Sequence, residues 1–324
     1  MWHVGGAGIA GSYLYRRMQD SGIESMIYDP RVENFYIPCG FATNKHLIIP
    51  YLSKVSVDLG DILETEASSV TVKGNNFQET EFRPSGLCTI NKMELEKKIL
   101  GNGEITRSTI KGNGGNIVDA TGISRGYLGK IPGDLSMFAV EKVCRESPFK
   151  GFHFNFFKNG NGYFWSFPLK GRYHIGAGGV NLDEVQASLA GYQGERVLSR
   201  KIRMKPTMGN IVNGNIIGVG ESIGYISPLL GEGIVPALES AEKLFQAISR
   251  YEDYESITRY YGQSISGRMK VFNDISIMVS NIQHGKTLNL HNILTARKAL
   301  SEVKNFGMNP DFYKIFAHFL SAGK

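Results

Sequence analysis

The sequence predicts a mixed α/β fold with two interleaved domains, one of parallel strands joined by helices and one built on an antiparallel sheet, followed by a helical C-terminal tail. Three observations support this prediction. The first residues combine a short apolar run, a glycine-rich turn and an amphipathic helix, the pattern of a strand leading into a crossover helix. Residues 136–179 are aromatic and strand-like, with turn signals between the runs. A buried-strand pattern then returns at residues 215–220, so the antiparallel domain is inserted into the first domain.

The elements follow from local patterns of apolar and turn-forming residues. In chain order we expect a strand and glycine turn at 1–8, a helix at 9–21 ended by Gly22, a strand at 25–29, antiparallel strands within 62–85, a helix at 91–100, a buried strand and glycine turn at 116–122, the antiparallel sheet at 136–179, a buried strand at 215–220 and a helix at 233–250. Residues 32–60 show no clear periodicity. The predicted domains are residues 1–60, 86–135 and 205–250; residues 61–85 and 136–204; and a helical region at 251–324.

The composition is that of a globular protein. The chain has 324 residues, of which 42% are hydrophobic and 39 are glycine, and this glycine excess indicates many tight turns. Three cysteines without CxxC spacing cannot form a disulfide framework, so we expect a reducing, cytoplasmic environment. We recognise no signal peptide at the start and no apolar run of about 18 residues that could span a membrane.

The net charge of +6 limits the choice of partners. The basic residues are scattered and no nucleic-acid motif is present, so we expect no nucleic-acid partner. The tail carries six basic residues against two acidic ones: Lys286, Arg297, Lys298, Lys304, Lys314 and Lys324. This is either a solvated helical face or a surface that rests on anionic lipid headgroups at the inner membrane surface.

A GxGxxG motif lies at the predicted first strand–helix turn. Gly6 permits the tight turn, Gly8 lets the backbone approach a diphosphate, and Gly11 lets the helix lie close to the strand. The diphosphate would lie at the helix N-terminus, beside Ala10, where unpaired N–H groups favour an anion. Asp29 ends the second strand, next to Pro30, at the position that binds a ribose. Together they predict a Rossmann-like dinucleotide site.

Two further glycine turns favour FAD over NAD as the dinucleotide. Thr121-Gly122 follows a buried strand, and Gly220-Glu221 follows another. A segment that opens the last helix of this domain holds Gly231, Gly233 and Ile234. Such turns offer N–H groups to a ribityl phosphate or a flavin. A cofactor that contacts three distant parts of the chain must be long, as FAD is.

These motifs resemble those of the para-hydroxybenzoate-hydroxylase-type flavoproteins. Two segments resemble their geranylgeranyl reductase branch in particular. One is Pro38-Cys39-Gly40, similar to a Pro-Cys-Gly segment near the flavin. The other is Tyr163-x-Trp165-x-Phe167-Pro168, followed after seven residues by Gly176-x-Gly178. The resemblance implies an FAD enzyme that reduces isolated C=C bonds of prenyl chains, most often in archaeal ether-lipid precursors, with prenylquinones and prenyl diphosphates as the other substrates of the family.

The resemblance also implies roles for individual residues. Cys39 would lie near the flavin and either donate the proton that accompanies hydride transfer, a role that a nearby water could also fill, or position the double bond. As a free cysteine it could instead be buried and inert. Tyr163, Trp165 and Phe167 alternate along one strand and share a face, which either closes a core or lines a prenyl tunnel with Gly176 and Gly178.

Two cofactor positions depart from the family pattern. Glu221 stands where the family usually has aspartate, and Lys92 stands where arginine is common.

The electron donor would be a ferredoxin-like protein or NAD(P)H, because only one nucleotide fingerprint is present.

Two other functions remain open at this point. One is a flavin monooxygenase acting on an aromatic or polyketide substrate, and the other is a non-catalytic lipid-binding relative whose flavin site has decayed. None of the seven histidines shows metal-ligand spacing, so no metal site is predicted.

Overall fold

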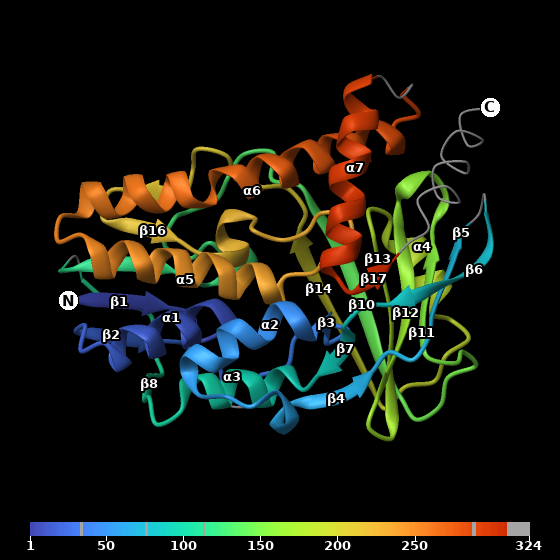
Figure 1. Ribbon diagram of the computed structural model, residues 1–324, viewed down its shortest axis with the longest axis horizontal. Coiled ribbons are helices and arrows are strands. Elements are labelled where there is room, and N and C mark those ends of the chain that lie inside the picture. The colour runs from blue at the N-terminus through green and yellow to red at the C-terminus, as the bar shows by residue number, and fades with distance from the viewer. Residues whose placement is uncertain (33–34, 75–76, 113, 287–289, 310–324) are drawn as a thin grey trace.

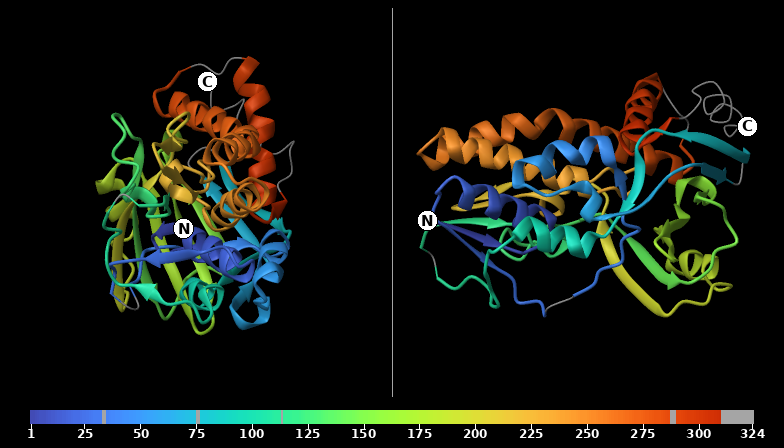
Figure 2. Two further views of the ribbon diagram at one scale, coloured as in Figure 1. Left: turned by 90° about the vertical axis from the view of Figure 1, so that its left-hand side faces the viewer. Right: turned by 60° about the horizontal axis from the view of Figure 1, so that its bottom comes forward.

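The computed structural model describes residues 1–32, 35–74, 77–112, 114–286 and 290–309 (Figure 1). Two large sheets lie toward opposite ends of the longest axis, and helices cover the first of them (Figures 1 and 2). A small three-stranded sheet lies between the two large sheets (Figure 1). The predicted mixed α/β class is confirmed.

The first sheet has six strands in the order β15-β16-β9-β1-β2-β8. All its pairs are parallel except β15–β16. The strands are β1 (Trp2–Gly5), β2 (Ser25–Tyr28), β8 (Ile105–Thr106), β9 (Asn116–Asp119), β15 (Val212–Asn213) and β16 (Ile216–Gly218). Strands β1, β9 and β16 are parallel neighbours, so their carboxyl ends lie side by side, although β16 comes about a hundred residues after β9 in the chain.

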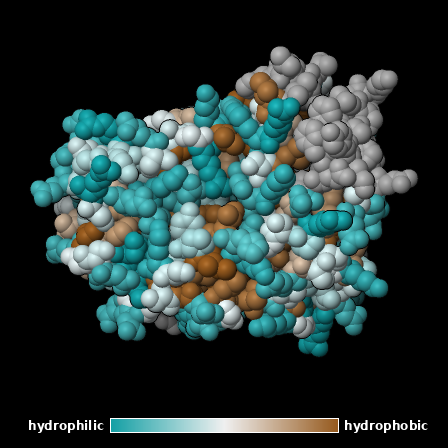
Figure 3. All heavy atoms as spheres, in the orientation of Figure 1, coloured by the Kyte–Doolittle hydropathy of each residue, from teal (hydrophilic) through white to brown (hydrophobic). Residues whose placement is uncertain are grey.

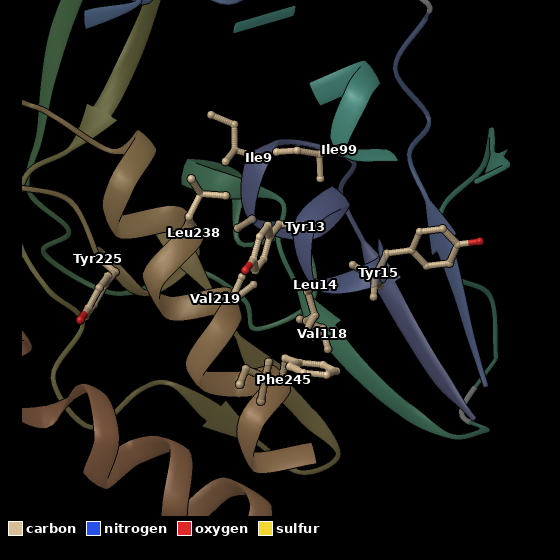
Figure 4. Packing of buried hydrophobic residues seen from close by; sticks show 14 of the residues in the cluster. Ile9, Tyr13, Leu14, Tyr15, Ile99, Val118, Val219, Tyr225, Leu238 and Phe245 are labelled. Carbon is tan, nitrogen blue, oxygen red and sulfur yellow. The ribbon is translucent and has the colours of Figure 1, made fainter. Parts of the chain in front are cut away.

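Helix α1 (Ile9–Asp20) packs between α3 (Lys92–Leu100) and α5 (Ile234–Arg250). Figure 4 shows Tyr13 of α1 beside Leu238 of α5, and Leu14 of α1 next to Val118, all in one apolar cluster with Ile99 of α3. The side chain of Asn91 caps α3 by accepting a hydrogen bond from the Glu94 N–H (3.1 Å), as an Asn before an amphipathic run predicts.

The second sheet has eight strands in the order β14-β10-β13-β12-β11-β5-β6-β17. They are β5 (Val70–Gly74), β6 (Phe77–Pro84), β10 (Ser136–Cys144), β11 (Phe152–Phe156), β12 (Gly162–Leu169), β13 (Arg172–Gly179), β14 (Arg196–Arg203) and β17 (Met308–Asn309). The pairs are antiparallel except β5–β11. Helix α4 (Leu182–Ser188) packs on β13.

Residues 32–60 contain more structure than their pattern indicates. They form β3 (Ala42–Asn44) and α2 (Lys45–Leu52), followed by two short 3₁₀ helices, Ser53–Val55 and Leu59–Asp61. Pro50 lies inside α2, and a proline there obscures the helical pattern. Strand β3 pairs with β7 (Leu87–Ile90), which pairs with β4 (Leu63–Glu66). This small sheet contacts β12, because the Thr89 hydroxyl donates to the Pro168 carbonyl oxygen (2.7 Å).

The C-terminal helices contribute to the core. Helix α6 (Tyr254–Gln283) packs on α5 and adds Tyr261 and Phe272 to the main apolar cluster. Helix α7 (Leu290–Asn305) leads into β17, which pairs with β6. Of the six basic residues of the tail, Lys298 pairs with Asp274 at 2.8 Å, and Lys314 and Lys324 lie outside the described residues.

The face seen in Figure 1 is mostly hydrophilic, with hydrophobic residues gathered near its middle (Figure 3). Within the described ranges, we find no helix with the length and apolar character needed to span a bilayer.

Candidate functional site

The GxGxxG turn leaves an open approach at Gly8. A Cβ built on Gly6, which has φ +103°, would lie 2.5 Å from the Ala120 carbonyl oxygen, and one on Gly11 would overlap the Gly6 carbonyl oxygen. These two glycines are therefore needed for packing. At Gly8 the nearest atom to such a Cβ is Oε1 of Glu96, at 3.8 Å. The N-terminus of α1, with Ala10 in its first turn, is thus accessible on the side where a diphosphate would bind.

Asp29 lies at the end of β2 and fixes the glycine turn. Its Oδ2 accepts a hydrogen bond from the Ala7 N–H (2.7 Å), and Arg31 Nε donates to the same carboxylate at 2.9 Å. Burial alone raises the pKa of Asp29, but these hydrogen bonds outweigh it and lower the pKa. The carboxylate is therefore ionised, with Arg31 as its partner, while Pro30 is exposed beside it.

The three glycine turns converge at the carboxyl edge of the first sheet. A Cβ built on Gly220 would lie 3.2 Å from Cβ of Ala10, and one on Gly122 would lie 3.3 Å from Oε2 of Glu221. The structure thus brings together turns that are about a hundred residues apart. Thr121 has a structural role here, because its hydroxyl donates to Oδ1 of the buried Asp119 (2.6 Å).

Two buried arginines hold the 3₁₀ helix at Gly220–Ile223 against the one at Gly122–Ser124. Arg203 donates to the Glu221 carbonyl oxygen at 2.7 Å and pairs with Asp134. Arg125 donates to the Ser222 carbonyl oxygen at 2.5 Å. The sequence analysis missed both, because their partners lie far along the chain.

Glu221 forms an ion pair with Arg200 of β14, and its Oε1 accepts from the Arg203 N–H (3.2 Å). The longer carboxylate at this position is thus held by the antiparallel sheet.

The predicted cofactor segment with Gly231, Gly233 and Ile234 lies where α5 begins. Gly231 has φ +65° and no atom near its open side, and Gly233 is the N-cap before Ile234. The Glu232 side chain accepts from the Val235 N–H at 2.9 Å, and burial raises its pKa to about 7 although this hydrogen bond opposes the rise.

The aromatic strand residues form a wall on one face of the second sheet. We call Tyr163, Trp165 and Phe167, together with Phe152 and Phe154, the aromatic wall; all five belong to one apolar cluster with Leu230 and Phe306. Trp165 and Phe167 are 6% and 4% exposed. The Tyr163 hydroxyl donates to the Leu230 carbonyl oxygen at 2.5 Å, which links the wall to the Gly231 turn.

Gly176 makes room for Trp165, and Gly178 lies beside the same ring. A Cβ built on Gly176 would overlap the Trp165 ring, and one on Gly178 would lie 3.6 Å from Cζ3 of the same ring. Both glycines are on β13, which pairs with β12. The absence of a side chain at Gly176 is therefore needed for the position of Trp165 in the aromatic wall.

The Pro38-Cys39-Gly40 segment lies directly against this wall. A Cβ built on Gly40 would lie 2.7 Å from Cδ2 of Phe167 and 3.1 Å from Nε1 of Trp165. Burial raises the pKa of the Cys39 thiol, and the positive charge of Lys92 offsets only part of that rise. The thiol is therefore protonated at neutral pH. Lys92 itself is buried and pairs with Glu96 at 2.5 Å.

Behind Cys39 lie three polar residues that the sequence analysis missed: Tyr36, Glu141 and His174. His174 Nδ1 lies 3.0 Å from the Cys39 carbonyl oxygen, and Tyr36 Oη lies 2.9 Å from His174 Nε2. Glu141 is fully buried on β10, in register with Gly176. A charged residue at an inward position of an apolar strand was the available signal. The described part of the chain holds no cluster of three His, Cys, Asp or Glu side chains that could bind a metal.

No family model matches the chain. An uncharacterized protein of Methanocaldococcus jannaschii is 27% identical, in an alignment that covers 79% of this chain and 85% of the relative. A geranylgeranyl bacteriochlorophyll reductase-like structure from Thermoplasma acidophilum has a TM-score of 0.71 at 14% identity, covering 94% of this chain and 98% of that one. The Pseudomonas aeruginosa structure of pqsL, a probable FAD-dependent monooxygenase, has a TM-score of 0.63 at 13% identity, covering 87% and 96%. The chain therefore has the fold of the FAD-dependent oxidoreductases, as the sequence resemblance implies.

Proposed function

We propose that this protein is an FAD-dependent reductase of isolated C=C bonds in a prenyl lipid of the geranylgeranyl type. The observation that carries the proposal is the position of the Pro38-Cys39-Gly40 segment, which lies on the aromatic wall. A protonated thiol and an apolar aromatic surface thus meet beside turns suited to a flavin nucleotide.

The residues present fit FAD. The glycine loop around Gly8 is open at a helix N-terminus, and Gly231 leaves a second open turn at the start of α5. We assign Asp29 to a ribose, and Gly122 and Glu221 to the ribityl chain; in this structure Asp29 pairs with Arg31 and Glu221 with Arg200. When bound in its reduced form, the flavin supplies a hydride to one alkene carbon.

The chain's own residues bind, orient and protonate. We assign the prenyl chain to the aromatic wall, which packs on Leu230 and Phe306 in this structure and would hold the prenyl chain by apolar contact. An unactivated alkene depends strongly on such placement. The Cys39 thiol donates a proton to the second alkene carbon, which completes the addition of a hydride and a proton across the double bond. Lys92 then stabilises the thiolate until it is protonated again.

The reductant and the place of action belong to this proposal too. We assign electron supply to a ferredoxin-like protein or NAD(P)H. We also assign the protein to the cytoplasmic side of the membrane, where the prenyl lipid is available.

Anaerobic turnover tests the proposal. The protein is loaded with FAD, reduced with dithionite and mixed with a geranylgeranyl lipid, and mass spectrometry should show mass gains of two hydrogens per reduced bond. Mass spectrometry of lipids extracted from the purified protein would identify the bound chain. An unchanged lipid mass with fully reduced flavin would overturn the assigned reaction.

A flavin monooxygenase is the second candidate, because the pqsL structure shares the fold. Mixing the reduced protein with oxygen separates the two: a monooxygenase should give a lasting flavin peroxide and an oxygenated product. A colourless protein that takes up no FAD would instead indicate a non-catalytic lipid-binding protein.

A further inference from the structure

A continuous hydrogen-bonded chain of three side chains ends on the backbone of Cys39. His174 Nδ1 lies 3.0 Å from the Cys39 carbonyl oxygen, and His174 Nε2 lies 2.9 Å from Tyr36 Oη. Tyr36 Oη in turn lies 3.3 Å from Oε1 of Glu141. Glu141 and His174 are 0% and 2% exposed, so bulk water does not reach them.

The chemistry of the groups sets the direction of each hydrogen bond. A carbonyl oxygen only accepts, so His174 must carry a proton on Nδ1. Nε2 of a neutral imidazole is then an acceptor, and the Tyr36 hydroxyl donates to it. With a neutral imidazole, the Tyr36 oxygen is left to accept from Oε1 of Glu141, which can donate only as a carboxylic acid; if Glu141 is ionised, the Tyr36 hydroxyl donates to it instead.

One other arrangement has the same number of protons. In it, Glu141 is ionised, His174 carries both ring protons, and Tyr36 donates to the carboxylate. Burial decides between the two, because removing two charges from water costs more than their attraction returns unless the geometry is excellent. Burial raises the pKa of Glu141 well above its usual range, although hydrogen bonds from the Cys39 N–H and the Tyr36 hydroxyl oppose the rise. Burial also lowers the pKa of His174 to about 4, with Arg172 adding to the fall and the hydrogen bond to Cys39 opposing it, even though His174 Nδ1 lies 3.5 Å from Oε1 of Glu141. For both groups burial outweighs these contacts, so the neutral form is favoured.

We propose that Glu141, Tyr36 and His174 are positioning residues that hold the main chain of Cys39 against the aromatic wall through a charge-free hydrogen-bonded chain. Position 141 therefore needs a hydrogen-bond donor, not a charge. The importance of this chain for catalysis rests on the proposed function, whereas its protonation state does not.

Phe41 supports this interpretation. It follows Gly40 with φ +59°, a backbone conformation that a bulky residue adopts only where the surroundings hold it. Its ring packs on the His174 imidazole with centroids 4.5 Å apart. Tyr36 and Phe41, which lie before and after the Pro38-Cys39-Gly40 segment, thus both contact His174.

Two spectra of the unmodified protein test the protonation state. Infrared spectra at pH 7 should contain the C=O stretching band of a protonated carboxylic acid, which Glu141→Gln removes. Nitrogen-15 NMR should show the His174 ring protonated at Nδ1 alone, with the resonance assigned by its loss in His174→Gln. An ionised carboxylate with a doubly protonated ring would overturn the proposal.

Alkylation of Cys39 by iodoacetamide, located by mass spectrometry, tests the positioning. Tyr36→Phe and Glu141→Leu break the chain and should speed alkylation at least tenfold, whereas Glu141→Gln keeps a donor and should stay within twofold of the unmodified protein. Equal rates in all four proteins would also overturn the proposal. If Glu141→Leu does not fold, Tyr36→Phe alone decides. If the unmodified protein gives the expected infrared and NMR spectra but does not reduce the alkene, the result counts against the proposed function only.

Discussion

At the scale of single residues, the surroundings of Cys39 determine what it can do. Burial raises the pKa of its thiol, and Lys92 is the largest opposing influence. A thiol whose pKa is raised keeps its proton at neutral pH and is unsuited to act as a nucleophile; the proposed function uses that proton. A buried inert cysteine would share the high pKa, so a functional test is needed.

Cys39→Ala should retain FAD and lose most alkene reduction, by about 10²–10⁴-fold, because the proton donor is removed. The absorbance spectrum of the bound flavin and the anaerobic lipid assay measure the two properties separately. Cys88→Ala is a matched control, since Cys88 lies in the core of the small sheet. Unchanged turnover of Cys39→Ala would remove Cys39 from the mechanism.

Gly8→Val should weaken FAD binding on the order of a hundredfold, about 2.7 kcal/mol. The side chain would fill the open approach to the N-terminus of α1, where a diphosphate needs the backbone. Titration with FAD, followed by flavin fluorescence, measures the affinity. Gly191→Val is the control, because Gly191 is exposed and has no atom near its open side. Full FAD affinity in Gly8→Val would contradict the placement.

The stability of the protein should fall in acid partly through His174. Its pKa of about 4 lies below the ordinary value of 6.5, so its contribution to stability is present above pH 6.5 and is lost as the pH falls through 4. Urea unfolding at several pH values should therefore show a steeper acid loss in the unmodified protein than in His174→Gln. Glu141, whose pKa is raised, acts in the opposite direction: its contribution is lost as the pH rises. Parallel curves for the two proteins would contradict the pKa assigned to His174.

At the scale of elements, short 3₁₀ helices carry the cofactor turns, and buried arginines hold them. The 3₁₀ helix at Gly220–Ile223 has few internal hydrogen bonds. Arg203 and Arg125 hold it in place because they donate hydrogen bonds to its backbone carbonyl oxygens. Charge-assisted hydrogen bonds of this kind are among the stronger ones in proteins.

Arg203→Met should destabilise the protein by about 3–5 kcal/mol, because it leaves Asp134 without its buried partner and the Glu221 carbonyl without a donor. Chemical denaturation measures the loss. Arg145→Met is the control, since its ion pair with Glu195 is exposed and should be worth less than about 1 kcal/mol. Equal stabilities of the two variants would show that the arginine cluster does not hold this turn.

Local patterns could be predicted from the sequence, whereas long-range contacts could not. The glycine loop and α1 follow from spacing alone, and the helix predicted at 9–21 is found at Ile9–Asp20. Helix α2 was not predicted because Pro50 interrupts its pattern. The position of Gly40 on Phe167 and the chain from Glu141 to Cys39 depend on pairing between distant strands, which no local pattern encodes.

At the scale of the whole molecule, the aromatic wall is assembled from distant parts of the chain. Phe306, which follows α7, is 5% exposed and packs on Phe154 with ring centroids 6.2 Å apart. Helix α6 likewise completes the core under the first sheet. The C-terminal helices thus stabilise both sheets.

Phe306→Ala should lower the free energy of unfolding by about 3–5 kcal/mol through the cavity it leaves beside Phe154. Trp165 lies in the same apolar cluster, so its fluorescence during urea unfolding reports the change. Leu294→Ala on α7 is the control, since Leu294 is 55% exposed and should cost less than about 1 kcal/mol. A loss no larger than that of the control would mean that Phe306 does not seal the wall.

The pairing of β17 with β6 has a consequence for biosynthesis. Met308 and Phe306 cover aromatic rings that are synthesised more than a hundred residues earlier. A nascent chain therefore exposes an apolar sheet face until residues 306–309 have been synthesised and have packed on it. Newly made protein should depend on chaperones during that interval, and truncation before α7 should lead to aggregation.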